Sequence, residues 1–197
     1  MQIEFFGATR EVTGSCYLIQ VGNSCLLLEC GLIQGSQDHE RHNRDPFPFE
    51  PGRIDAVVLS HAHLDHSGRL PLLINRGFKG PIYSHSASVD LCAIMLQDAA
   101  YLNEKETEWE NRKRQRKGLD LLQPLYTRQQ ARSAQDHFKP LEYGKTMEIL
   151  PGKGHFPPSF KIVIRTFPLV LIAFVLDADS LKPFTRRHQI TFGQRRG

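Results

Sequence analysis

The chain has 197 residues, with 25 Lys and Arg side chains against 21 Asp and Glu, 40% hydrophobic residues and four cysteines. This length and composition fit one globular domain or two small ones, and they exclude collagen-like, disulfide-scaffold and fully disordered chains. Residues 1–150 hold 17 basic and 19 acidic side chains, whereas residues 151–197 hold 8 basic and 2 acidic ones. The net charge of +4 therefore comes from the last segment and does not indicate a nucleic-acid-binding domain.

The predicted elements begin with strands and then alternate between strands and helices. Strands are expected over residues 2–6, 16–21, 24–29, 54–60 and 81–84, and helices over residues 70–76, from 88 into the polar segment 103–117, and over 127–138. Residues 31–55 read as a long loop, and the tail from 151 has no clear period. This order predicts an α/β layered domain.

Three features of the sequence indicate where in the cell the chain is expected. The N-terminus lacks the basic stretch and long apolar run of a signal peptide. The longest apolar run, residues 167–176, is well short of the roughly 20 residues that a membrane-spanning helix needs. The cysteines form no Cys-x-x-Cys pair, which predicts reduced, buried thiols. We therefore expect a cytoplasmic chain with no membrane segment.

A histidine-rich motif follows the apolar run 54–60. His61, His63, Asp65 and His66 lie within six residues of one another. Side chains two residues apart in an extended segment project to the same side, so His61 and His63 can share a metal. After a turn, Asp65 and His66 can face a second metal. Imidazole and carboxylate ligands suit zinc best, with manganese or iron as substitutes, so the motif predicts a metal site.

This motif and the strand before it resemble the HxHxDH pattern of the metallo-β-lactamase superfamily. Further segments resemble its β-CASP RNA-processing subgroup, which includes the nuclease subunit of the cleavage and polyadenylation machinery: residues 6–18, 29–35, 43–49, 67–71, 80–83 and 124–127. The resemblance covers about residues 1–150. It implies the N-terminal part of an αββα sandwich, with the β-CASP insert and the second half of the fold missing, followed by an unassigned tail over residues 151–197.

The resemblance also implies a zinc-dependent hydrolase. His61 and His63 would bind one zinc, and Asp65 and His66 the other. A metal-bound hydroxide would attack the phosphorus of an RNA phosphodiester, with Asp65 accepting a proton from the nucleophile. RNA is then the expected partner. Two alternatives stay open: hydrolysis of a thioester, lactone or lactam on the same fold, and a catalytically silent fragment.

The sequence departs from the family's pattern in two ways. Glu29 stands where the family more often has Asp, which moves the carboxylate one methylene outward and predicts looser support of the metal ligands. The family's downstream ligands, two histidines and a bridging aspartate, are not readable, so we expect two protein ligands per metal and weak affinity. Half a sandwich would also leave an apolar sheet face and strand edges uncovered. The abrupt loss of pattern near residue 152 suggests an aberrant or out-of-frame tail.

Other candidate ligands have weaker context. His85 follows a predicted strand and faces either the site or solvent. His155 lies near the expected third histidine in chain order but lacks its neighbours. Asp177 and Asp179 fit a turn after an apolar strand better than a bridging role, and His137 is expected on the surface. None of these residues is predicted to bind metal.

One basic run, residues 112–117, invites an RNA-binding interpretation. Four acidic residues precede it: Glu104, Glu106, Glu108 and Glu110. This order favours a solvated helix with pairs of opposite charge. The single Trp109 gives no stacking platform by itself, so the sequence alone does not predict an RNA contact here.

Overall fold

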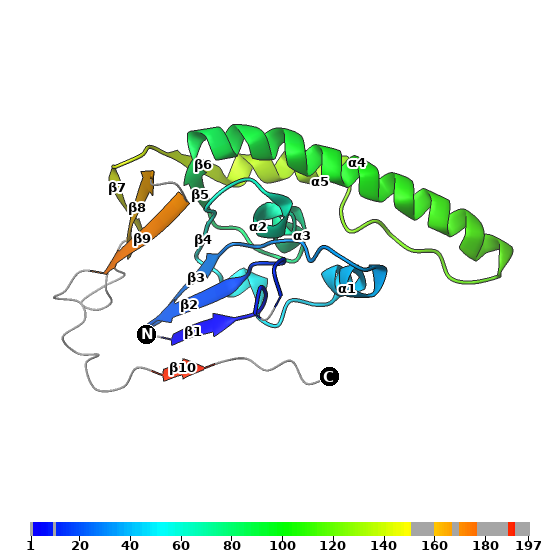
Figure 1. Ribbon diagram of the computed structural model, residues 1–197, viewed down its shortest axis with the longest axis horizontal. Helices are drawn as coiled ribbons and strands as arrows, with labels where there is room; N and C mark the ends of the chain where they lie inside the picture. Colours follow the sequence, from blue (N-terminus) through cyan, green and yellow to red (C-terminus); the bar gives the residue numbers. More distant parts are fainter. Residues whose placement is uncertain (1, 10, 151–159, 167–169, 177–188, 192–197) are drawn as a thin grey trace.

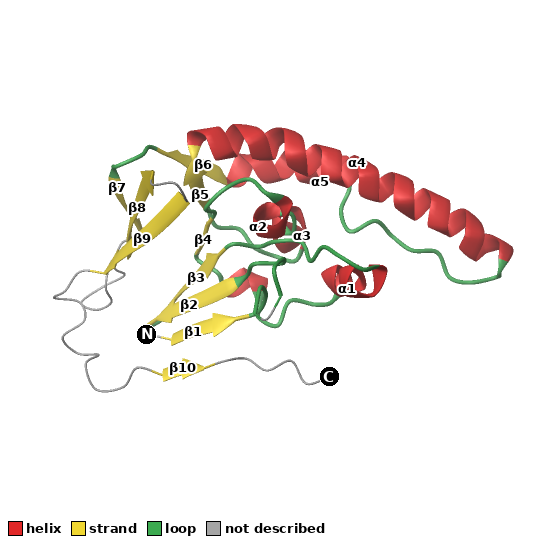
Figure 2. Ribbon diagram, in the orientation of Figure 1, coloured by secondary structure: helices red, strands yellow, loops and turns green. Residues whose placement is uncertain are grey.

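The computed structural model describes residues 2–9, 11–150, 160–166, 170–176 and 189–191 (Figures 1 and 2). Within these residues, the strands form a seven-stranded sheet of order β10-β1-β2-β3-β4-β5-β6 and a three-stranded sheet of order β7-β8-β9. The larger sheet comprises β1 (Gln2–Phe5), β2 (Tyr17–Val21), β3 (Ser24–Leu28), β4 (Ala56–Val58), β5 (Ile82–His85), β6 (Phe138–Leu141) and β10 (Gln189–Thr191). The smaller comprises β7 (Thr146–Leu150), β8 (Phe160–Thr166) and β9 (Val170–Leu176). The predicted α/β class is confirmed.

The helices lie along one side of the larger sheet, and α4 projects well beyond it (Figure 2). The α-helices are α1 (Gln37–Arg41), α2 (Leu64–Ser67), α3 (Leu70–Asn75), α4 (Ser86–Arg116) and α5 (Arg128–Ser133). Short 3-10 turns occupy η1 (His42–Arg44), η2 (Pro51–Arg53) and η3 (Ala134–His137). The predicted loop over residues 31–55 therefore contains three short helical turns. None of the described helices is long and apolar enough to cross a membrane.

Several predicted boundaries were wrong. The strand expected over residues 54–60 is only Ala56–Val58, and two helix boundaries also differ. The helix expected from residue 88 begins at Ser86, because His85 caps it by accepting a hydrogen bond from the Ala87 amide. The helix expected through residue 138 ends earlier, and Phe138 instead begins β6, which pairs in parallel with β5. A proline at position 140 disfavours helical geometry at the residue before it, which explains this ending.

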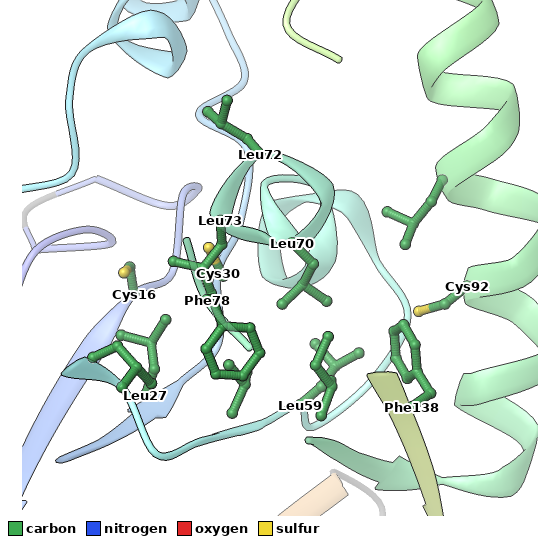
Figure 3. Packing of buried hydrophobic residues seen from close by; sticks show 14 of the residues in the cluster. Cys16, Leu27, Cys30, Leu59, Leu70, Leu72, Leu73, Phe78, Cys92 and Phe138 are labelled. Carbon is green, nitrogen blue, oxygen red and sulfur yellow. The ribbon is translucent and has the colours of Figure 1, made fainter. Parts of the chain in front are cut away.

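Alternating side chains of the central strands fill two separate cores. Leu18, Leu27 and Val57 face the helices and pack with residues such as Leu70 and Cys92 (Figure 3). This side is predominantly apolar and contains all four cysteines, each a free thiol, as predicted. The alternation follows from the two-residue period of a strand.

The opposite face of the larger sheet is covered, which corrects the expectation of an exposed apolar face. Ile19, Leu26 and Val58 on this face are at most 6% exposed. Ile149 of β7 packs in the same cluster, so the smaller sheet contributes to the cover. In addition, β10 pairs in parallel with β1, so that edge of the sheet has a neighbour.

Candidate metal centre

The histidine motif lies where parallel strands end. Strands β3, β4 and β5 run in parallel, with Leu28 opposite Val58 and Val58 opposite Tyr83. The carboxyl ends of parallel strands meet at one edge of a sheet, so the segments after β3 and β4 emerge side by side. The first of these segments begins with Glu29 and the second contains His61. Residues 32 positions apart are thereby brought together at this edge.

The four predicted ligands form two close pairs. His61 Nε2 lies 3.1 Å from His63 Nδ1. His66 Nε2 lies 3.4 Å from Asp65 Oδ2. The two pairs are adjacent, because the ring centroids of His61 and His66 are 4.1 Å apart. The structure thus brings together all four side chains that the motif singled out.

In His61 and His66, the Nδ1 atom of the ring has a partner outside the site. This contact orients the ring so that Nε2 faces into the site. His61 Nδ1 lies 2.8 Å from Ser60 Oγ, which leaves Nε2 facing His63. His66 Nδ1 lies 3.3 Å from Glu29 Oε2, which leaves Nε2 facing Asp65. Metal-binding histidines commonly donate their other N–H to such partners, which fixes the tautomer and the ring orientation.

Glu29 supports the motif through both carboxylate oxygens. Its Oε1 accepts a hydrogen bond of 2.9 Å from the Ser60 amide, and its Oε2 faces His66. The residue is only 3% exposed and has a left-handed backbone with φ of 62°. Within the described chain, Glu29 Oε2 and His66 Nδ1 have no other hydrogen-bond partner. The longer side chain therefore still reaches two parts of the motif, although looser support was expected.

These contacts shift two histidine pKa values in opposite directions. Burial lowers the pKa of His61, and the neighbouring rings of His66 and His63 lower it further. Burial also opposes protonation of His66, but the hydrogen bond and charge of Glu29, with the charge of Asp65, outweigh it and raise its pKa. Without metal, His66 is therefore protonated at a higher pH than His61.

The motif is also held by main-chain hydrogen bonds to the segment after β3. The amides of Cys30 and Leu32 donate to the carbonyls of His66 and Leu64, at 2.7 and 2.8 Å. Between them, a Cβ on Gly31 would lie 1.6 Å from the Asp65 carbonyl oxygen, so only glycine permits this close approach. Sequence reasoning gave Gly31 no role, although it lies in a segment that carried the family resemblance.

The weaker candidates lie elsewhere or are not described. His85 caps α4, and its ring stacks on Tyr143 with centroids 3.7 Å apart. His137 is half-buried and lies 2.9 Å from the Gly80 carbonyl oxygen, so the expectation of a surface residue was wrong. His155, Asp177 and Asp179 lie outside the described residues.

The donor set fits zinc in chemistry and spacing. Two donors about 2.1 Å from a tetrahedral zinc stand roughly 3.4 Å apart. The observed separations of 3.1 Å for His61–His63 and 3.4 Å for Asp65–His66 are close to this value. In the described part of the chain, no group of three or more His, Cys, Asp or Glu side chains forms a metal-binding set. The described donors are thus two pairs, and their role as metal ligands stays a prediction.

Comparison with known proteins shows the family of this chain. The family model described as the Metallo-beta-lactamase superfamily matches residues 9–126, more than half of the chain. The chain belongs to this superfamily. Its members are metal-dependent proteins.

The chain is similar in sequence to individual proteins of the RNA-processing branch. The chain is 39% identical over 171 residues to Ribonuclease TTHA0252 of Thermus thermophilus, covering 84% of this chain and 35% of the relative. It is 29% identical over 151 residues to Transcription termination factor FttA of Methanocaldococcus jannaschii, covering 77% and 22%. It is 36% identical over 97 residues to Integrator complex subunit 11 of Danio rerio, covering 47% and 16%. The chain therefore spans about a third or less of the length of these relatives, and the resemblance to their branch of the superfamily is confirmed.

Proposed function

We propose that this chain provides the metal-binding motif of a zinc-dependent RNA phosphodiesterase. The main support is the convergence of His61 Nε2 on His63 Nδ1, beside the pair of Asp65 and His66. The similarity to a protein named ribonuclease supports RNA as the substrate. A cytoplasmic location and RNA as partner, both expected from the sequence, belong to this proposal.

Each residue of the motif has a distinct role in the proposed phosphodiesterase. His61 and His63 would hold one zinc, and Asp65 and His66 a second. Bound zinc lowers the pKa of water and offsets charge on phosphoryl oxygens. Asp65, whose side chain is 21% exposed, would accept a proton from the attacking water. Glu29 acts through His66 as a positioning residue.

Hydrolysis assays test the substrate class. The full chain, loaded with zinc, is given labelled single-stranded RNA or a chromogenic ester, each with and without a chelator. We expect RNA cleavage that the chelator abolishes, and a loss of about a hundredfold or more in Asp65→Asn. Asp90→Asn, an exposed carboxylate on α4, is the matched control and should retain activity. Ester cleavage without RNA cleavage would overturn the proposed substrate.

Metal analysis tests the ligands independently of activity. Purified chain equilibrated with zinc should hold two ions, and His61→Ala should hold fewer. His85→Ala is the control, because this histidine caps α4 and should not change the zinc content. A chain that retains no zinc would refute the proposal and leave the catalytically silent alternative.

A further inference from the structure

The outward face of α4 carries an exposed tryptophan among basic side chains. The inward face of the helix is marked by its buried residues: Cys92, Leu96, Ala100 and Thr107. Trp109, Arg112, Lys113 and Arg116 follow each other at intervals of three, one and three residues, so they share the opposite face. All four are exposed, and Trp109 is 59% exposed. We call these four residues the Trp109 ridge.

The sequence suggested that neighbouring glutamates neutralise the positive charges of this ridge, but the residues that the structure describes show no such pairing. In the described part of the chain, no ion pair joins the preceding glutamates to the basic run, and Glu108 pairs with Lys105 at 2.9 Å. Among the described residues, no carboxylate forms an ion pair with the three basic residues of the ridge. Arg114, from the same run, points elsewhere and donates to the Asp120 carbonyl. Within the described chain, the ridge thus presents three cations without an ionic partner on the same helix face as one indole.

The indole is held by one of these cations. Lys113 Nζ lies 3.1 Å from the centroid of the Trp109 ring, which is a cation–π contact. Helix-dipole stabilisation accounts for basic residues in the last turns of α4, but it gives no reason for an exposed indole between them. Stacking on an aromatic ring with cations nearby is how proteins bind single-stranded nucleic acid without sequence preference.

The part of α4 that carries the ridge is held by the segment that follows the helix. Asn111, on the inward side of α4, donates to the Leu122 carbonyl at 2.8 Å and accepts from the Leu122 amide at 2.7 Å. Asn103 accepts from the Leu125 amide at 2.7 Å. The segment that follows α4 therefore runs back along the helix and braces it, as the return path in Figure 1 shows. A braced helix loses less backbone entropy when a ligand binds to its surface.

The ridge lies far from the metal motif along one continuous helix. Near its start α4 packs against α2, which contains Asp65 and His66. Trp109 follows the buried Cys92 by 17 residues, which is about 25 Å along the helix axis. An RNA that reaches from the motif to the ridge must therefore extend well beyond the reacting phosphate.

We propose that the Trp109 ridge binds a stretch of single-stranded RNA outside the catalytic site, with a base stacked on Trp109 and phosphates near Arg112 and Arg116. The inference rests on the proposed function, since RNA is its substrate. The three cations of the ridge favour a polyanion over an apolar protein surface.

Tryptophan fluorescence tests this surface directly, because Trp109 is the only tryptophan in the chain. The full chain is titrated with a long single-stranded oligouridylate in the presence of chelator, so that binding is measured without hydrolysis. Quenching that saturates is expected, and Trp109→Leu should weaken binding, measured by anisotropy of a labelled oligonucleotide, by about tenfold. The cleavage assay compares this long RNA with a trinucleotide, which is too short to contact the metal motif and the ridge at the same time. Trp109→Leu should slow cleavage of the long RNA only.

Salt dependence identifies the phosphates that the ridge binds. Arg112→Gln combined with Arg116→Gln should reduce the slope of log Kd against log salt by about 0.7 for each phosphate that these side chains neutralise. Arg76→Gln combined with Lys79→Gln removes the same charge from exposed positions elsewhere and should leave the slope unchanged. Circular dichroism verifies that both double variants keep their helix content.

The outcomes separate the two proposals. If RNA leaves the Trp109 fluorescence of the unsubstituted chain unchanged and Trp109→Leu leaves the Kd unaltered, with RNA cleavage intact, the ridge is overturned and the phosphodiesterase stands. Quenching without any zinc-dependent cleavage would overturn the phosphodiesterase instead. Equal loss of affinity in both double variants would also overturn the ridge, because it would show unspecific attraction to net charge.

Discussion

Glu29 shows how much of the metal motif depends on one side chain outside it. Its left-handed backbone costs about 1 kcal/mol for a residue with a Cβ. The same geometry directs a buried carboxylate to the Ser60 amide and to His66. The residue thus connects the end of β3 to the first and last parts of the motif, and the strain accompanies that connection.

Glu29→Gln should lower the pKa of His66. The glutamine keeps an acceptor for the Ser60 amide but removes the negative charge that raises this pKa. NMR titration of the His66 ring in the metal-free chain measures the change. Glu50→Gln, an exposed carboxylate, is the control. An unchanged His66 titration would contradict the role given to Glu29.

The same variant should change how stability depends on pH. A raised folded pKa means that protonated His66 stabilises the fold below its ordinary value of 6.5 and that this contribution is lost as the pH rises through the raised value. Glu29→Gln should lack this loss. Urea unfolding of both metal-free proteins, at a pH below 6.5 and at a pH above the raised pKa of His66, measures this difference in stability.

At the scale of elements, α4 is longer than its own packing on the sheet requires. Its first half buries Cys92, Leu96 and Ala100 against the domain, whereas its second half is braced by the segment over residues 117–126. The sequence predicted that this half extends into solvent, which is correct for the outward face only. Thr107, 6% exposed, marks the covered side.

Asn111→Ala should release the bracing segment. The substitution removes both hydrogen bonds to the Leu122 backbone and should cost about 1–3 kcal/mol in local stability. Hydrogen exchange and limited proteolysis of residues 117–126 should both accelerate. Gln115→Ala, at an exposed position on the same helix, should have little effect. Equal protection in the two variants would show that the segment is held by other contacts.

At the scale of the whole molecule, the larger sheet has an apolar core on each face. The first core lies under the helices, and the second includes Ile149 of β7 together with Ile19 and Leu26. Covering both faces removes apolar surface from water, which is the main source of folding stability. The described chain therefore forms a layered domain and not an open sheet.

Ile149→Ala tests whether β7 belongs to this folding unit. Loss of a side chain that is 3% exposed should lower the free energy of unfolding by about 2–5 kcal/mol. Met147→Ala, on the same strand but 39% exposed, should cost less than about 1 kcal/mol. Urea unfolding monitored by circular dichroism compares them. Similar small losses in both would indicate that the smaller sheet adds little to the second core.

The sequence by itself determined the features that depend on neighbours in the chain. Apolar runs of strand-forming residues predicted the central strands, and the close spacing of His61, His63, Asp65 and His66 predicted the candidate site. The Thr127–Gln130 capping box, which starts α5, is likewise a local pattern. Only the tertiary structure decided the contact of Glu29 with His66, the close approach at Gly31, the burial of the second sheet face and the outward ridge around Trp109. The reason is physical: periodicity and capping act within a few residues, whereas burial, charge pairing and close approach depend on segments that only folding brings together.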